Sequence, residues 1–273
     1  MRFSVCACDQ DLHWRFPFPL RGSYEHCARL AAKIGYDAIE LQVQDPLKYD
    51  GNKLKTCLDA YHMQVSSVTT GLAFTFEGMS MTDDDADARK KTVTRLKRQL
   101  DLAKVLDTKI LLGIIRGRMK LGETKEDFEA KLTDSMWCLL EYAKEIGSGI
   151  IFEHINRNDG DIYNSTERTM QFIEKFQSPY LFYNIDTYHM ITDDPSPTEA
   201  LKRSWKKLEL FHVSDEDRML PDDKHFDFVE VADLLQRLNY QRWVTLECKP
   251  LPTSEVAARQ GFDYLKRVFK KQV

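Results

Sequence analysis

The sequence lacks the features that mark several large classes of protein. Its longest apolar runs, such as KILLGII at 109–115, fall far short of the roughly 20 residues that span a bilayer. It contains no basic block, and Lys+Arg 39 against Asp+Glu 43 gives a formal charge of -4. Neither nucleic acid nor an anionic membrane is therefore expected as the main partner, and a small molecule is favoured.

Paired cysteines and a glycine-rich turn are also missing. The six cysteines are scattered without a CxxC pair, and MRFSVCACDQ at the start has no long apolar segment after a basic one. We therefore expect reduced thiols and a cytoplasmic protein. The segment CACDQDLHW, which follows the first apolar run, has no glycine, and this argues against a dinucleotide-binding fold.

Short runs of strand-forming residues alternate with longer stretches of helical spacing. The eight runs are RFSVCA, AIELQV, QVSSVT, KILLGII, GIIFEHI, LFYNID, LELFHV and WVTLEC. Helices are predicted at 23–36, 82–108, 124–147, 165–177 and 228–241, the second with an N-terminal cap at Thr82. This alternation in a chain of 273 residues predicts one (β/α)8 TIM-barrel domain over 1–273, with a doubly wound open sheet as the alternative.

Polar side chains end four consecutive predicted strands. Glu153 ends the fifth, Asp186 the sixth, His212 the seventh and Glu247 the eighth. Catalytic groups of such barrels come from the C-terminal ends of the strands, so these four are expected to converge. One such acid alone is more often a solvated loop residue, but three carboxylates buried together require a cation. The mixed oxygen and nitrogen set suits one divalent ion of the Mn, Co or Mg kind, with Glu153 and Glu247 as an acid/base pair.

The order of these residues resembles that of the xylose-isomerase-like barrels, which include ketose 3-epimerases and hydroxypyruvate isomerases. The residues that carry the resemblance are Glu153, Asp186, His189, His212, Arg218 and Glu247. The resemblance runs over the whole chain, and GMSMTDDDADARKKTVTRLKRQLDLA, ILLGIIRGR, EHINRND and LECKPLP look like segments of the 5-keto-L-gluconate epimerase branch.

The resemblance implies an isomerase or epimerase that depends on a divalent metal, preferably manganese. Glu153, Asp186, His212 and Glu247 would hold the metal. Glu153 and Glu247 would exchange a proton next to a ketose or keto-hexonate carbonyl through an enediolate. His189 and Arg218 would bind oxygens of the sugar or sugar acid. A homo-oligomer, either a dimer or a tetramer, is also implied.

Two segments depart from the family pattern. In EHINRND, His154 replaces a proline that is common in the family, and Asp159, a predicted substrate contact, replaces a second glutamate. In MLPDDKHFDF, Asp222 and Lys224 stand where glycines are common. These changes bear on which sugar is bound.

Other side chains have two interpretations each. Arg116, in IIRGR after the fourth strand, is a predicted substrate ligand that would hold a carboxylate through paired N–H donors, or else it is a charged loop residue. Phe16 and Phe18 either roof the pocket or pack against neighbouring loops.

The same site also suits other functions. A metal-dependent lyase would eliminate a β-substituent from 3-oxo-glycosides, as in C-deglycosidases, with a partner subunit and with His154 as an extra acid/base. Phosphate cleavage of the endonuclease kind and non-catalytic sugar binding are the remaining alternatives.

Overall fold

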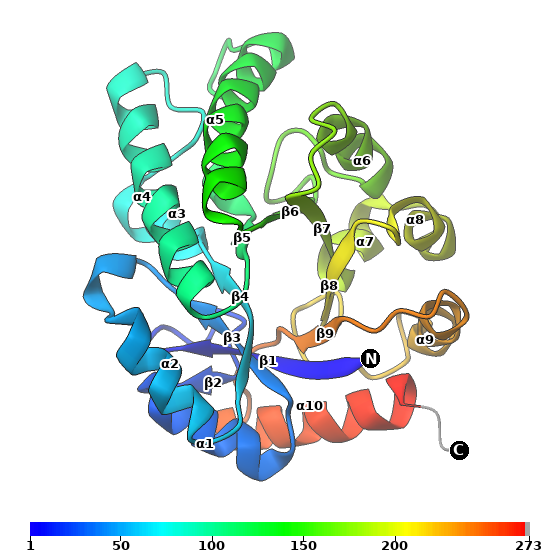
Figure 1. Cartoon of the computed structure of the whole chain (residues 1–273). Coiled ribbons are helices and arrows are strands. Elements are labelled where there is room, and N and C mark those ends of the chain that lie inside the picture. The colour runs from blue at the N-terminus through cyan, green and yellow to red at the C-terminus, as the bar shows by residue number, and fades with distance from the viewer. Residues whose placement is uncertain (271–273) are drawn as a thin grey trace.

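Eight parallel strands close into a barrel in the computed structural model, which describes residues 1–270 (Figure 1). They follow the order β1-β3-β4-β5-β6-β7-β8-β9, and β1 pairs with β9 to complete the ring. The strands are β1 (Arg2–Cys8), β3 (Ala38–Gln42), β4 (Gln64–Thr69), β5 (Ile110–Leu112), β6 (Ile150–Glu153), β7 (Leu181–Asp186), β8 (Leu208–Val213) and β9 (Trp243–Leu246), with the short β2 (Leu20–Arg21) added to β1. The predicted (β/α)8 barrel is confirmed, and each predicted run corresponds to one barrel strand. The final part of the predicted domain, 271–273, lies outside the described residues.

Helices cover the outside of this barrel, and short helices follow several strands directly (Figure 1). They are α1 (Tyr24–Ile34), α2 (Gly51–Asp59), α3 (Gly71–Glu77), α4 (Ala86–Val105), α5 (Lys125–Ile146), α6 (Thr166–Glu174), α7 (Thr187–Asp193), α8 (Pro197–Ser204), α9 (Phe228–Arg237) and α10 (Ser254–Phe269), with 3-10 helices η1 (Pro46–Lys48) and η2 (Ile114–Arg116). The five predicted helices appear as α1, α4, α5, α6 and α9. None of the helices in residues 1–270 is long and apolar enough to cross a membrane.

One predicted helix start is wrong. The side chain of Asp85, rather than that of Thr82, caps α4, because Asp85 accepts a hydrogen bond from the Asp87 N–H. The hydroxyl of Thr82 is buried and donates to the Arg116 carbonyl at 2.9 Å. Thr82 therefore ties the chain ahead of α4 to η2.

The barrel interior changes from apolar to polar along the strands. Near the N-terminal ends, one buried apolar cluster consists of Ala38, Leu111, Ile151, Leu210 and Trp243. Side chains of a strand alternate between its two faces, so the residues two positions further on also face inward. These residues are Glu40, Gly113, Glu153, His212 and Thr245. The apolar cluster thus fills the barrel interior nearer the N-terminal ends of the strands. The polar layer lies directly above it, at the C-terminal end, where the strands lead into loops.

Candidate metal and sugar site

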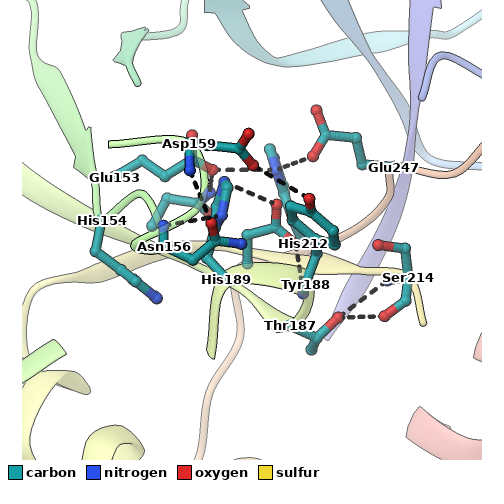
Figure 2. A network of polar contacts seen from close by, with 12 residues as sticks. Glu153, His154, Asn156, Asp159, Thr187, Tyr188, His189, His212, Ser214 and Glu247 are labelled. Atoms are coloured by element: carbon teal, nitrogen blue, oxygen red, sulfur yellow. Dashed lines mark hydrogen bonds and ion pairs between the residues drawn. The ribbon is translucent and has the colours of Figure 1, made fainter. Parts of the chain in front are cut away.

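The four residues predicted from the strand ends meet at the C-terminal mouth of the barrel. His212 Nδ1 lies 3.3 Å from Glu247 Oε2 and 3.6 Å from Glu153 Oε1. Ligand atoms of Glu153, Asp186 and His212 all lie within 4.8 Å of one another. Figure 2 shows Glu153 and His212, from the strands β6 and β8, and Glu247, from the segment directly after β9, around this point. The neighbouring order of β6, β7, β8 and β9 in the barrel brings the four together.

The donor set fits a divalent cation. Within residues 1–270, His212 Nδ1 is buried without a hydrogen-bond partner, and two carboxylates face it. The His212 Nε2 is already bonded to Glu40, so the free nitrogen is the one that points into the cluster. Three carboxylates and one imidazole offer the oxygen and nitrogen ligands that a Mn, Co or Mg ion accepts.

The surroundings drive the pKa values of the two glutamates apart. Burial raises the pKa of Glu153 to about 8, an effect that His212 opposes and that Asp186 and Glu247 reinforce. Burial also acts to raise the pKa of Glu247, but Arg218 and His212 outweigh it and lower that pKa to about 2. Without a cation, the surroundings therefore favour the protonated form of Glu153 and the ionised form of Glu247, and a bound cation would favour the ionised form of both.

Two residues outside the predicted set hold the Glu153 carboxylate in place. Asn184, on the adjacent strand β7, donates from Nδ2 to Glu153 Oε1 at 2.6 Å. On the other side lies Gly113, where a Cβ would come within 2.6 Å of Glu153 Oε2. The glycine after β5 therefore provides the space that the carboxylate occupies.

His189 lies on α7, directly after β7, and lines the cavity described below. The Asn156 N–H donates to its Nδ1 at 3.1 Å, so the neutral ring carries its hydrogen on Nε2. Burial and then the neighbouring Arg218 lower the pKa of His189 well below its usual value. His189 is thus a neutral N–H donor, with Nε2 at 3.7 Å from Asp186 Oδ2.

Arg218 reaches the same cluster from the loop after β8. Its Nη1 lies 2.6 Å from both Asp186 Oδ2 and Glu247 Oε2. The backbone of Arg218 has a φ of 65°, in the left-handed region that few non-glycine residues adopt. The Lys249 N–H donates to the Arg218 carbonyl at 2.7 Å and ties this loop to the segment after β9.

Asp159 lies beside the same cavity and is positioned by a tyrosine. The Tyr188 hydroxyl donates to Asp159 Oδ2 at 3.1 Å (Figure 2). The Arg218 guanidinium stacks over the Tyr188 ring, 4.0 Å from its centroid. Tyr188 therefore connects two predicted substrate contacts.

The cavity above the cluster has a volume of about 220 Å³. That is below the roughly 300–1,000 Å³ of sites for drug-sized ligands, so it suits a molecule about as large as a monosaccharide. Among its lining residues are the polar groups Glu153, Asp159, His189, Arg218 and Glu247 and the apolar groups Phe16, Phe18, Leu72, Ile114 and Ile155. The pocket-lining interpretation of Phe16 and Phe18 therefore agrees with their position.

Arg116 does not lie where a substrate ligand should. It is 2% exposed, and its donors go to the carbonyls of Glu153 at 2.8 Å and Ile162 at 3.1 Å. It is not among the residues that line the cavity. After Gly113 the chain turns into η2, which directs the guanidinium beneath the loop that follows β6. Arg116 therefore supports that loop, and its prediction as a substrate ligand is wrong.

Of the four substituted residues, Asp159 lines the cavity, and His154, Asp222 and Lys224 do not. His154 is buried, with Nδ1 at 2.7 Å from the Tyr183 hydroxyl, and Figure 2 shows its ring directed away from Glu247. Burial and then Arg116 lower its pKa to about 3, which keeps it neutral. Lys224 is exposed and pairs with Asp222 at 2.5 Å, and neither of them lines the cavity. These positions do not support His154 as an extra acid/base for a lyase.

The fold is a TIM barrel, and this strand-end cluster is a candidate metal site. The chain belongs to the xylose isomerase-like TIM barrel family, whose model matches residues 28–268. An L-ribulose 3-epimerase from Methylomonas sp. (strain DH-1) is 25% identical over 219 residues, which cover 80% of this chain and 75% of the relative. A ketose 3-epimerase from Arthrobacter globiformis is 22% identical over 238 residues, which cover 86% of this chain and 81% of the relative.

Solved structures show the same fold. The D-psicose 3-epimerase from Clostridium cellulolyticum H10, solved with D-tagatose, has a TM-score of 0.83 at 18% identity and covers 99% of this chain and 100% of its own. The match of the family model over 28–268 confirms the predicted family. The prediction of an isomerase is confirmed at the level of the family, because the sequence relatives are named epimerases, which are isomerases.

Sequence reasoning missed four residues of the site, namely Glu40, Gly113, Asn184 and Tyr188. Glu40, in AIELQV, was visible as a charged residue inside an otherwise apolar strand. Gly113 interrupts KILLGII, which is also a recognisable signal. Nothing local marks Asn184 or Tyr188, because their roles depend on partners 31 and 29 residues away in the chain.

Proposed function

We propose that this protein is a divalent-metal-dependent ketose epimerase, with manganese as the preferred ion. The observation that carries the proposal is the convergence of Glu153, Asp186, His212 and Glu247 beneath a cavity that His189 and Arg218 also line. These four would hold the ion. When bound, it would polarise the substrate carbonyl and stabilise the charge that develops on the substrate oxygens.

The two glutamates move the proton. Glu247, whose carboxylate Arg218 Nη1 holds at 2.6 Å, removes the hydrogen from the carbon next to the carbonyl. Glu153, whose carboxylate Asn184 Nδ2 holds at 2.6 Å, returns a proton to the same carbon from the other side. Removal on one face and return on the opposite face invert that carbon, which is an epimerisation. The neutral His189 donates its Nε2–H to a substrate oxygen.

Charge in the cavity favours a neutral ketose over a sugar acid. Three lining residues are carboxylates, and Arg218 is the one Lys or Arg side chain among the described lining residues. Arg218 is already paired with Asp186 and Glu247. With Arg116 turned away, a keto-hexonate carboxylate finds no uncommitted guanidinium there. We therefore favour D-psicose, D-tagatose, L-ribulose and their epimers as substrates.

The test is proton NMR in D2O with manganese-loaded protein and each neutral ketose, with 5-keto-gluconate and tagaturonate as the acidic comparison. We expect metal-dependent loss of one C–H signal, at the carbon beside the carbonyl, and appearance of the epimer from a neutral ketose. Glu153→Gln and Glu247→Gln should each abolish the exchange while the metal stays bound. Full turnover in either variant would refute the acid/base assignment.

A further inference from the structure

Beneath the proposed metal site, the carboxylate of Glu40 lies buried inside the barrel. Glu40 is on β3 and is 0% exposed. Its Oε1 accepts from Cys6 Sγ at 3.2 Å and from Gln42 Nε2 at 3.3 Å. Its Oε2 accepts from Ser67 Oγ at 2.8 Å and lies 3.0 Å from His212 Nε2. Glu40 is thus a polar group of the barrel interior with no direct place in the proposed proton transfer.

The four contacts around Glu40 determine which nitrogen of His212 carries hydrogen. A carboxylate has about four lone-pair positions, and thiol, amide and hydroxyl donors take three of them. The fourth faces His212 Nε2, which must therefore donate. In the neutral imidazole this leaves the lone pair on Nδ1, the nitrogen that faces Glu153 and Glu247.

Glu40 also fixes the direction of the ring. His212 is held at one end by this carboxylate, and at the other end its Nδ1 has no hydrogen-bond partner in the described part of the chain. A histidine that binds a metal almost always donates its second N–H to a carboxylate, a carbonyl or water, which orients the ring and makes the ligating nitrogen more basic. The Glu40–His212 pair has the geometry of that arrangement, and it joins β3 to β8 across the barrel.

We propose that Glu40 is a positioning residue that sets the tautomer and orientation of His212 for the metal. The proposal rests on the proposed function only in taking His212 Nδ1 as a metal ligand. Glu40 touches neither the cavity nor the reacting atoms, since it is not among the cavity-lining residues. Its effect should therefore appear in metal binding before any substrate is added.

The test compares Mn²⁺ binding to wild type, Glu40→Gln and Ser66→Ala by isothermal titration calorimetry without sugar. Glutamine keeps the size of the side chain but loses the charge, and we expect about 10- to 100-fold weaker binding. Ser66 is a matched control, because it is buried in the same interior and bonds Ser4 Oγ at 2.7 Å rather than Glu40. Its variant should bind Mn²⁺ as the wild type does. Wild-type affinity in a folded Glu40→Gln variant would overturn the proposal.

A second measurement needs no variant. In ¹⁵N-histidine-labelled wild-type protein saturated with diamagnetic Mg²⁺, NMR should find the hydrogen of His212 on Nε2. A hydrogen on Nδ1 would overturn the proposal even if Glu40→Gln did not fold. A wild-type chain that binds Mn²⁺ but exchanges no sugar proton would refute the proposed function and leave the role of Glu40 standing.

Discussion

Replacing Gly113 with alanine should misplace the Glu153 carboxylate. The new Cβ would lie 2.6 Å from Glu153 Oε2, whereas ordinary contact begins at 3.4 Å. The oxygen would therefore have to retreat by roughly 0.8 Å. The hydrogen bond from Asn184 Nδ2 to Oε1, at 2.6 Å, resists that movement. Gly113 itself belongs to no barrel strand, so we expect the fold to persist.

A misplacement of about 1 Å in a catalytic group costs on the order of 100-fold in rate. We expect Gly113→Ala to slow deuterium exchange by about 10- to 100-fold, equivalent to about 1.4–2.7 kcal/mol of activation free energy. The assay is the same NMR exchange experiment, with thermal unfolding followed by circular dichroism to establish that the variant is folded.

Gly51→Ala is the matched control. Gly51 begins α2, and its added Cβ would meet side-chain carbons of Val105 and Leu102 at 3.1 and 3.2 Å, away from the glutamates. This variant should exchange within about twofold of wild type. A folded Gly113→Ala variant with wild-type exchange would refute the view that this glycine reserves space for Glu153.

Two further predictions concern the surroundings of the site. Burial and Arg116 lower the pKa of His154 to about 3 in the folded protein, whereas the pKa of an unfolded histidine is near 6.5. The buried neutral ring therefore stabilises the fold fully above pH 6.5. This stabilisation is lost as the pH falls toward 3, by up to about 1.4 kcal/mol of unfolding free energy per pH unit. His154→Gln should make the unfolding free energy, measured by urea titration at pH 5 and pH 7.5, depend less on pH; an unchanged difference would contradict this. The Arg21 guanidinium donates to carbonyls of the loop that carries Phe16 and Phe18, including that of Phe16 at 2.9 Å and that of Phe18 at 3.3 Å. Without these hydrogen bonds the loop should be less ordered, so Arg21→Gln should raise KM more than it lowers kcat and should speed proteolysis within 9–19. An unchanged KM and an unchanged cleavage rate would show that the loop does not need Arg21.

Much of the site follows from local pattern. The ends of the fifth to eighth apolar runs could be identified from the sequence, and Glu153, Asp186, His212 and Glu247 stand at those ends. Consecutive strands of a parallel barrel are neighbours, so their C-terminal ends meet without any knowledge of long-range contacts. For this reason the sequence sufficed to predict that the four converge.

The error at Arg116 has a different origin. Its position after the fourth strand was predicted correctly, but the direction of its side chain depends on η2 and on the carbonyls of Glu153 and Ile162, 37 and 46 residues away. The incorrect cap at Thr82 is similar, because that hydroxyl is taken up by the carbonyl of Arg116. Local propensity does not reveal that a side chain has a better partner elsewhere.

By itself, then, the sequence determined the number and order of strands, the barrel and the four residues of the proposed metal site. These depend on the two-residue period of strands, on the helical period and on the order of elements, all of which can be read along the chain. The tertiary structure decided what surrounds them: the space left by Gly113, the bonds from Asn184 and Tyr188, and the contact between Glu40 and His212, which are 172 residues apart. Closing the barrel places β3 and β8 on opposite sides of one interior, and this proximity has no local signature in the amino-acid sequence.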